Sequence, residues 1–126
     1  MGIRLKNYQK GVNAEILVMT YLKKKLYTII KHRYKSKLGE IDLIAAKNDL
    51  LLFIEVKNRK NFLDYDVISK KQKIRCCETA LYFISQHTDF SNYNMRFDCM
   101  FVDDYGMIKH LQNAWSISDF NISGWL

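Results

Sequence analysis

The sequence of 126 residues contains no proline, only three cysteines and no long apolar run. The absence of proline by itself excludes no function. A membrane-spanning helix needs about 20 consecutive apolar residues, and since no run approaches that length we expect no membrane span. Residues 1–11, MGIRLKNYQKG, lack the apolar core of a secretory signal peptide, and Lys6 stands where a myristoylation signal requires Ser or Thr. The sequence therefore predicts a cytoplasmic protein.

The cysteines form neither a disulfide framework nor a zinc pattern. Cys76 and Cys77 are neighbours, which do not bridge easily within a helix, and the odd number leaves Cys99 over. The three histidines are scattered, and none is paired with a cysteine, so Ser–His or Cys–His nucleophilic catalysis has no support. We interpret the cysteines as reduced side chains that fill the interior.

The charge is distributed unevenly along the chain. The net charge is +7, but residues 1–75 carry 18 Lys and Arg against 7 Asp and Glu, whereas residues 76–126 carry 2 against 6. A basic region that also contains a cluster of carboxylates suits a polyanionic substrate such as nucleic acid. The alternative is that the lysines only solvate helix surfaces.

The length and the share of 48% hydrophobic residues predict one globular domain over residues 1–126. Hydrophobic periodicity and turn residues predict an α/β fold with the order α-β-β-β-α-β-β. The expected helices are 8–25 and one that begins at a cap, Asp66 or Ser69, and ends near 86. The expected strands are 26–34, 38–46, 50–56, 95–103 and 107–111.

A β-hairpin lies at the centre of this arrangement. Residues 38–46 and 50–56 are apolar and β-prone, and Lys47-Asn48-Asp49 between them is a polar turn. If Asn48 and Asp49 are the two loop residues, the numbers of paired positions add up to 97. A shift of one residue would move every side chain of one strand to the other face.

This register places two carboxylates opposite each other. Asp42 faces Glu55, and Glu40 faces Lys57, with Cβ atoms of opposed residues about 4.5–5.5 Å apart. Like charges across a ladder are destabilising, so a compensating divalent cation is expected, because Mg²⁺ takes carboxylate oxygens and keeps waters for substrate. The alternative is a solvated face on which the two carboxylates have no joint role.

The same residues resemble a nuclease motif. Asp42 followed by Glu55-Val56-Lys57 is similar to the D…ExK core of the PD-(D/E)XK nuclease superfamily. The strings GEIDLIA and FIEVKNR resemble more closely the YraN family of bacterial proteins, which are predicted endonucleases. The similarity extends to residues 10–15 and to Arg96-Phe97-Asp98. The resemblance implies a restriction-endonuclease-like mixed β-sheet flanked by helices.

The resemblance also implies further site residues. A glutamate on the first helix often joins the metal site in the superfamily, which indicates Glu15, although a surface carboxylate that pairs with a lysine is equally compatible with its position. A lysine of the second long helix faces the active site in the family, and here Lys70 and Lys71 both qualify. A lysine on an apolar stripe can also extend its charge to solvent. Arg96 and Asp98 are expected to form a structural ion pair.

Basic and aromatic residues near the hairpin are candidates for contact with nucleic acid. Lys31, Arg33, Lys35 and Lys37 alternate from the predicted strand 26–34 toward the hairpin. At period two they would line one face or edge, either as a phosphate track or as an edge protected against aggregation. Tyr34 beside Arg33 suits a nucleic-acid strand, because bases stack on aromatic rings. Arg59 lies two residues after the last residue of the ExK triplet.

We therefore predict a divalent-metal-dependent nuclease that hydrolyses phosphodiester bonds, in DNA rather than RNA. The predicted catalytic residues are Asp42, Glu55, Lys57, Glu15, Lys70 and Lys71, and the predicted ligands of Mg²⁺ or Mn²⁺ are Asp42, Glu55 and Glu15. The predicted nucleic-acid-binding residues are Arg33, Tyr34, Lys35, Lys37 and Arg59. One alternative is a nucleic-acid-binding module of the same fold without catalysis. Another is an adaptor that binds partners through its aromatic tail, Trp115, Phe120 and Trp125.

Overall fold

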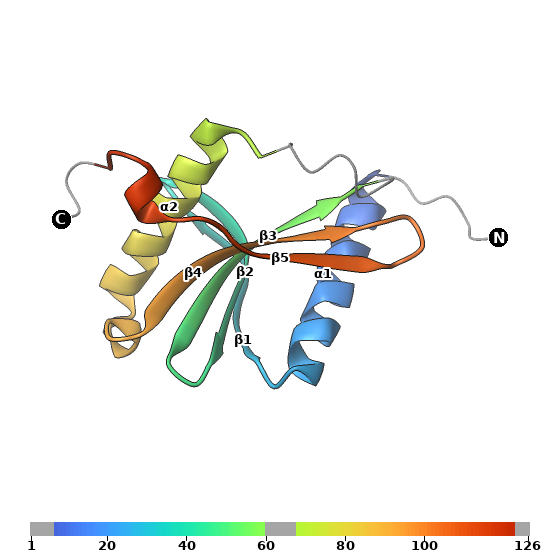
Figure 1. Ribbon diagram of the computed structural model, residues 1–126, viewed down its shortest axis with the longest axis horizontal. Coiled ribbons are helices and arrows are strands. Elements are labelled where there is room, and N and C mark those ends of the chain that lie inside the picture. Colours follow the sequence, from blue (N-terminus) through green and yellow to red (C-terminus); the bar gives the residue numbers. More distant parts are fainter. Residues whose placement is uncertain (1–6, 60–67, 123–126) are drawn as a thin grey trace.

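The computed structural model describes residues 7–59 and 68–122 (Figure 1). The predicted order α-β-β-β-α-β-β is confirmed. The elements are α1 (Asn7–Lys24), β1 (Thr28–Ser36), β2 (Gly39–Lys47), β3 (Leu50–Asn58), α2 (Lys70–Gln86), β4 (Asn94–Val102) and β5 (Ile108–Trp115), with short 3-10 turns at Thr88–Phe90 and Ile117–Asp119. The strand predicted over 107–111 is longer than expected. It begins at Ile108 and continues to Trp115, which is buried.

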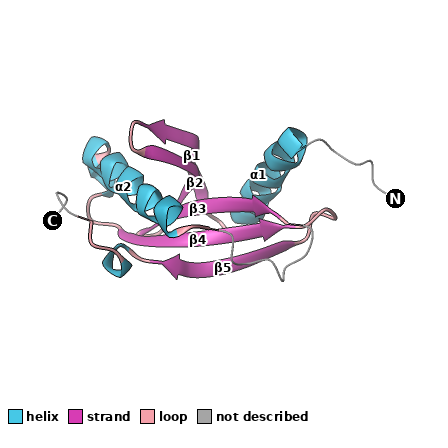
Figure 2. Cartoon of the chain, turned by 90° about the horizontal axis from the view of Figure 1, so that it is seen from above, coloured by secondary structure: helices cyan, strands magenta, loops and turns pink. Residues whose placement is uncertain are grey.

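The five strands form one mixed sheet in the order β1-β2-β3-β4-β5. All neighbours are antiparallel except β3 and β4, which are parallel and are joined through α2. The two helices lie on opposite faces of the sheet (Figures 1 and 2). No helix in the described ranges is long and apolar enough to span a membrane.

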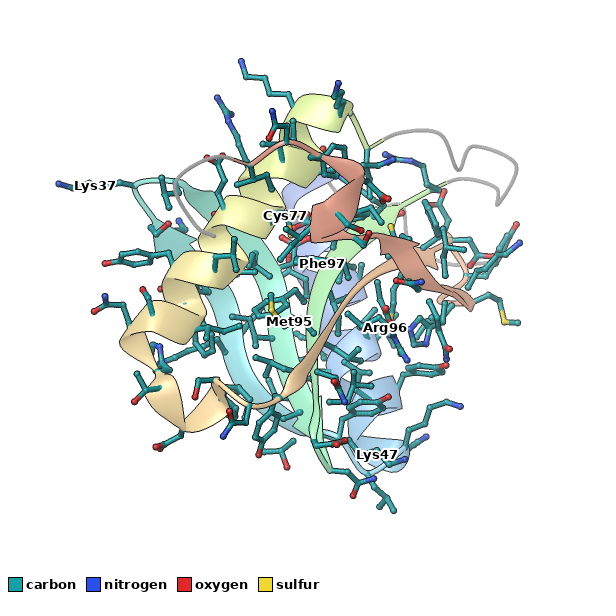
Figure 3. The ribbon with its side chains drawn as sticks, turned by 60° about the vertical axis from the view of Figure 1, so that its left-hand side comes forward. Lys37, Lys47, Cys77, Met95, Arg96 and Phe97 are labelled. Carbon is teal, nitrogen blue, oxygen red and sulfur yellow. The ribbon has the colours of Figure 1, made fainter. Side chains whose placement is uncertain are left out.

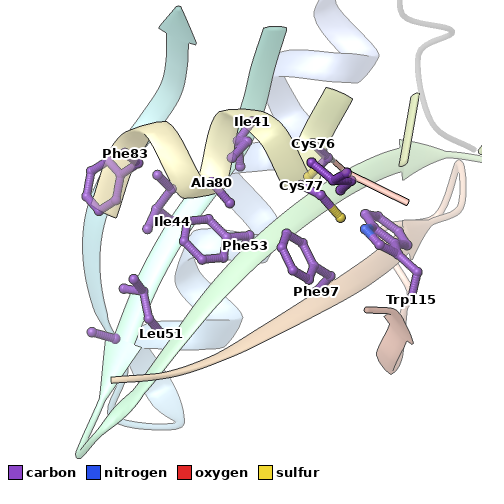
Figure 4. Packing of buried hydrophobic residues seen from close by; sticks show 12 residues of the cluster. Ile41, Ile44, Leu51, Phe53, Cys76, Cys77, Ala80, Phe83, Phe97 and Trp115 are labelled. Atoms are coloured by element: carbon purple, nitrogen blue, oxygen red, sulfur yellow. The ribbon is translucent and has the colours of Figure 1, made fainter. Parts of the chain in front are cut away.

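Alternation along the central strand β3 separates two hydrophobic clusters. Leu52 and Ile54 pack under α1, whereas Leu51 and Phe53 pack under α2. Since both faces of this strand are covered, it is a continuous apolar run rather than an alternating one. On the α2 side, Phe53 stacks on Phe97 with ring centroids 5.4 Å apart, and Phe97 stacks on Trp115 at 5.8 Å (Figure 4).

The β2–β3 hairpin has the predicted register. Its pairs run from Lys47 opposite Leu50 to Leu43 opposite Ile54, so the paired numbers add up to 97. Asn48 has φ 54°, a left-handed backbone conformation that Asn tolerates better than most residues. The recorded pairs end at Leu43 and Ile54, so the ladder stops where the acidic side chains begin.

Two local features fix α2 on the sheet. Ser69 caps the helix, because its Oγ accepts a hydrogen bond from the backbone N–H of Gln72 at 3.1 Å; the other predicted cap, Asp66, lies outside the described residues. A Cβ atom at Gly39 would lie 3.0 Å from Thr79 Oγ1. Glycine therefore permits the close approach between the start of β2 and α2.

Arg96 and Asp98 form the predicted ion pair, on the face of the sheet that α1 covers. The Arg96 guanidinium donates two hydrogen bonds to the Asp98 carboxylate, each 2.9 Å long. Asp98 also contacts His110 Nε2 at 2.6 Å and accepts from the backbone N–H of Asn113 at 3.0 Å. Tyr21 of α1 lies 3.3 Å from the other His110 ring nitrogen. This polar network therefore connects α1 to β4 and β5.

The segment after β5 packs on the core as far as the structure describes it. Trp115 is buried, and Phe120 packs against the same cluster as Phe53 and Phe97. The predicted tail residue Trp125 lies outside the described residues. Because Trp115 and Phe120 cover apolar surface, neither belongs to an exposed aromatic patch.

Candidate functional site

A cleft of about 460 Å³ opens where β2 and β3 separate. Its walls come from the N-terminal halves of the two helices and from the ends of the two strands. The side chains and backbone that line it belong to Ala14, Glu15, Gly39, Glu40, Asp42, Glu55, Val56, Lys57, Asn58, Gln72 and Arg75. Four carboxylates and the lysine of the sequence motif thus line one cleft together with two polar residues of α2.

Asp42 and Glu55 lie side by side in this cleft. The Asp42 carboxylate accepts a hydrogen bond from the backbone N–H of Val56 at 2.8 Å, which replaces a strand-to-strand bond at this point of the hairpin. The two carboxyl groups also hydrogen-bond each other when one of them is protonated. Lys57 lies close enough for its charge to favour the ionised form of both carboxyls. The two carboxyls meet one position beyond Leu43 and Ile54, the last pair of the β2–β3 ladder.

Burial raises the pKa values of both carboxyls, and a neighbouring negative charge adds to each rise, that of Glu15 for Asp42 and that of Asp42 for Glu55. Burial is the main cause for Glu55, the negative charge of Asp42 comes second, and together they raise the pKa of Glu55 to about 9. Burial also raises the pKa of Asp42, and the hydrogen bond from Val56 opposes this rise. At neutral pH the metal-free pair therefore retains a proton that isolated carboxyls would release.

We expect Glu55→Gln to remove a pH dependence of stability. Glu55 in the unfolded chain ionises near pH 4.5, whereas in the folded protein it holds its proton up to about pH 9. Because the folded state then binds more protons, metal-free stability should fall as pH rises through this window, by at most about 1.4 kcal/mol per pH unit. Thermal melts in EDTA across the window should show a flatter profile for Glu55→Gln, with the gain largest at its alkaline end.

Glu40→Gln is the matched control, since Glu40 lines the same cleft but is largely exposed. Its melting profile should run parallel to that of the wild-type protein. Parallel profiles for wild type and Glu55→Gln would instead mean that Glu55 titrates normally in the folded protein.

Glu15 lines the cleft from α1 and is almost fully buried. Its Oε1 lies 2.5 Å from His32 Nε2 and accepts a hydrogen bond from Arg33 Nε at 2.9 Å. Its negative charge also contributes to the raised pKa of Asp42. The predicted third ligand is therefore near the carboxylate pair but is already engaged by two side chains of β1.

Asp42 and Glu55 are the two predicted metal ligands whose carboxyls lie side by side. Within residues 7–59 and 68–122, no group of three or more Asp, Glu, His or Cys side chains is arranged to hold a metal. Mg²⁺ commonly binds through only one or two carboxylates and completes its shell with water and substrate phosphate. Two converging carboxylates whose repulsion a cation would relieve fit such an ion.

Arg33 has an unusual backbone. Its φ is 57°, in the left-handed region that costs a non-glycine residue roughly 1–2 kcal/mol. The β1–β2 pairs on either side of it are His32 with Leu43 and Tyr34 with Ile41. His32 was not predicted as a site residue. It precedes Arg33 in the strand, and neighbouring strand residues normally point to opposite faces, so both were not expected to reach Glu15.

The other predicted nucleic-acid-binding residues have different environments. Lys37 projects from the turn between β1 and β2 (Figure 3), and Lys35 is exposed with its Nζ 3.8 Å from Glu40. Tyr34 packs edge-to-face on Phe83, with ring centroids 5.2 Å apart, and so belongs to the core under α2. The backbone N–H of Arg59 donates to Val102 at 2.8 Å.

Helix α2 contributes residues other than the predicted lysines to the cleft. Gln72 and Arg75 line it, whereas Lys70 and Lys71 lie with Arg75 along a neighbouring groove on the helix surface. The spacing of Gln72, Arg75 and the buried Thr79 at helical intervals is the signal that could have identified the cleft-lining face. A catalytic role for Lys70 or Lys71 stays a prediction.

The three cysteines are free and buried. Burial, and next the charge of Glu55, raise the pKa of Cys76 well above its usual range and that of Cys99 to about 12. Burial also raises the pKa of Cys77, to about 11. A thiolate nucleophile is therefore not available at this cleft at neutral pH.

Comparison with known proteins relates the chain to one family. The family model described as "Uncharacterised protein family UPF0102" matches residues 14–102, which include every residue that lines the cleft. A UPF0102 protein of Ehrlichia ruminantium is 46% identical over 105 residues, which are 83% of this chain and 82% of that protein. A UPF0102 protein of Ehrlichia chaffeensis is 45% identical over 116 residues, covering 87% and 94% of the two chains. One of Mesorhizobium japonicum is 34% identical over 113 residues, covering 89% and 90%. The chain therefore belongs to the UPF0102 protein family.

Proposed function

We propose that this protein is a divalent-metal-dependent nuclease that hydrolyses phosphodiester bonds, with DNA as the favoured substrate. The observation that carries the proposal is the pair Asp42 and Glu55. These two carboxyls lie together in an open cleft, where burial raises the pKa values of both. Titratable groups with strongly perturbed pKa values in a cleft are typical of functional sites.

Each motif residue has a chemical role in this proposal. Asp42 and Glu55 would hold Mg²⁺ or Mn²⁺. The bound ion would supply a polarised phosphoryl oxygen and water of lowered pKa. Lys57, which lines the same cleft, would orient the attacking water or stabilise the charge that develops on the phosphate.

The resemblance and the charge distribution support the same proposal. Asp42 and the triplet from Glu55 to Lys57 resemble the D…ExK core of the PD-(D/E)XK nucleases, and the confirmed element order is the one that this resemblance implies. Basic side chains lie on both sides of the carboxylates. Arg33 and Lys35 are on β1, and Arg75 lines the cleft from α2. Such cations attract the phosphates of nucleic acid.

A nucleic-acid-binding module without catalysis is the second candidate. One observation favours it, since Glu15, the predicted third ligand, is bonded to His32 and Arg33. A site with fewer metal ligands would hold the ion more weakly. In this alternative the basic surface alone would account for the function.

The nuclease proposal predicts that metal stabilises the wild-type protein and permits cleavage. Mg²⁺ or Mn²⁺ should raise the melting temperature above that in EDTA, because a ligand that binds only the folded state stabilises it. The same ions should support cutting of at least one substrate among linear, flapped, looped and four-way DNA. Ca²⁺ is a useful comparison, since it prefers more oxygen ligands than this pair offers.

Nucleic-acid binding in EDTA is measured on the same panel. Binding without cleavage, together with an unchanged melting curve in all the metals, would exclude the nuclease and leave the binding module.

A further inference from the structure

One buried carboxylate joins two basic side chains at the edge of the cleft. The Glu15 side chain is 10% exposed, whereas those of His32 and Arg33 are 37% and 39% exposed. His32 Nε2 and Arg33 Nε both lie within hydrogen-bonding distance of Glu15 Oε1. Glu15 thus forms the buried base of a cluster whose basic members face solvent.

The backbone of β1 is shaped to make this cluster. In a regular strand, His32 and Arg33 would point to opposite faces. The left-handed φ of Arg33 interrupts that alternation and lets both side chains reach the same carboxylate oxygen. Strained residues of this kind persist where the surrounding contacts fix them, and they are concentrated at functional sites.

The cluster lies beside the carboxylate pair. The flanking pairs, His32 with Leu43 and Tyr34 with Ile41, place Arg33 at the register position next to Asp42. Glu15 lines the same cleft as Asp42 and is close enough to influence the pKa of Asp42. A phosphate next to the one held at the carboxylates would therefore meet His32 and Arg33.

We propose that His32 and Arg33 form a phosphate-binding pair at this edge of the cleft. Glu15 is the positioning residue that holds the pair in place, and it is not a ligand of the metal. The proposal rests on the proposed function, because it assigns the neighbouring phosphate of the same nucleic-acid substrate. Arg suits this task, since its guanidinium carries five donors in a rigid fork that matches phosphate geometry.

A purely structural cluster is the competing interpretation. In that case Glu15, His32 and Arg33 would only fasten β1 to α1, and changing them would lower stability without a specific effect on binding. The two interpretations differ in metal-free binding of nucleic acid, in its salt dependence, and in the coupling between Glu15 and Arg33.

The first test compares Arg33→Asn with Lys35→Ala. Asn tolerates a left-handed φ, so Arg33→Asn removes the guanidinium without forcing a new backbone conformation. Binding is measured in EDTA with a fluorescein-labelled DNA oligonucleotide, single-stranded and duplex, over a range of salt concentrations. Arg33→Asn should weaken binding about tenfold, as expected for a lost hydrogen bond to a charged group, and should lower the salt slope by about one. Lys35→Ala should have a smaller effect.

His32→Asn should weaken binding in the same direction, and Arg33→Lys should restore only part of the loss, because it keeps the charge but not the fork. Melting temperatures of all variants show whether each remains folded. Wild-type affinity and salt slope in a folded Arg33→Asn protein would overturn the proposal.

The second test separates positioning from metal binding by means of Glu15→Gln. The concentration of Mn²⁺ that gives half of the thermal stabilisation should stay at the wild-type value in Glu15→Gln, whereas Asp42→Asn should lose the stabilisation. A double-mutant cycle tests the coupling between Glu15 and Arg33. The effect of Glu15→Gln on oligonucleotide affinity should differ between the wild-type protein and the Arg33→Asn variant, because coupled residues give non-additive effects. A Mn²⁺ midpoint raised tenfold or more, with additive effects on binding, would make Glu15 a metal ligand and overturn the assignment.

These outcomes remain distinct from a failure of the proposed function. If the wild-type protein binds no oligonucleotide at any salt concentration, both proposals fall. If it binds and cuts while Arg33→Asn and His32→Asn match it, only the phosphate-binding pair falls.

Discussion

Asp42→Asn and Lys57→Ala should each abolish metal-dependent cleavage and leave the protein folded and able to bind nucleic acid. Asp42→Asn keeps the size of the side chain and removes a charge from the proposed metal-binding pair. Lys57→Ala removes a cation that lines the same cleft, where the proposed mechanism places the reacting phosphate. Losing an electrostatic group of this kind costs about 3–4 kcal/mol of transition-state stabilisation, or roughly 10²–10³-fold in rate.

The hairpin itself supplies matched controls for both variants. Asp49 is an exposed acidic residue of the β2–β3 turn, and Lys47 lies at the same end of the hairpin (Figure 3), with its Nζ over the Tyr27 ring at 5.4 Å. Asp49→Asn and Lys47→Ala should therefore cleave like the wild-type protein. Cleavage rates are compared under single-turnover conditions on whichever DNA the wild type cuts. Full activity in either cleft variant would remove that residue from the mechanism.

Binding and stability should respond to Asp42→Asn in the opposite direction. The substitution removes a negative charge near the phosphate, so metal-free affinity should hold or increase. It also removes the repulsion that contributes to the raised pKa of Glu55, so the melting temperature in EDTA should be equal or higher. A site of this kind sacrifices stability for function.

The part of the site that could be predicted from the sequence is the part that depends on period-two alternation. Asp42 and Glu55 were predicted to share a face because Asn48 and Asp49 define a short turn, and a short turn fixes the register of both strands. The ion pair of Arg96 and Asp98 was predicted from the resemblance of Arg96-Phe97-Asp98 to the motif of the YraN family.

The orientation of α2 was harder to predict. The sequence predicts an apolar stripe through Val67, Ile74, Cys77, Leu81 and Ile84. Cys77 is fully buried, whereas Ile74, Leu81 and Ile84 are only half-buried, and Val67 lies outside the described residues. The buried face of the helix consists of Cys76, Cys77, Thr79, Ala80 and Phe83. The helix is therefore rotated relative to the expected stripe, because small buried residues, which contribute little to a hydrophobic pattern, permit its close approach to β2 at Gly39.

The cluster on β1 could not be predicted from a strand pattern at all. Arg33 adopts a left-handed backbone, and no propensity rule assigns that conformation to arginine. Tyr34, which looked suited to stacking on a base, turns toward Phe83 instead. Both differences come from tertiary contacts with Glu15 of α1 and Phe83 of α2, which are far away in the sequence.

Asp98→Asn should lower the stability of the protein by several kcal/mol. The Asp98 side chain is fully buried and that of Arg96 is 22% exposed, so the substitution leaves a largely desolvated guanidinium without its counter-charge. Breaking a buried pair in this way costs about 3–5 kcal/mol, and the lower part of the range is expected because Arg96 retains contact with water. Urea unfolding at neutral pH measures the loss, and Asp49→Asn again serves as the exposed control.

The pH dependence of this loss identifies its electrostatic origin. Burial alone would raise the pKa of Asp98, but hydrogen bonds from His110, Arg96 and the Asn113 backbone outweigh it and hold the pKa below 3.8. The stability that Asp98 contributes is therefore fully present above pH 3.8 and is lost as pH falls through the lowered pKa. The deficit of Asp98→Asn should shrink in that acidic range. A deficit that stays constant there would mean that packing, rather than charge, is what Asp98 contributes.

Asp98→Asn and Asp42→Asn should also differ in activity. Asp98 lies in the network that connects α1 to β4 and β5, and it does not line the cleft. At a temperature where Asp98→Asn is still folded, its cleavage rate should remain near the wild-type value, although its unfolding midpoint is lower. Asp42→Asn should show the reverse, with no cleavage and undiminished stability. If Asp98→Asn lost cleavage while folded, the α1 network would have to hold Glu15 in its working position, and stability and activity would share this carboxylate.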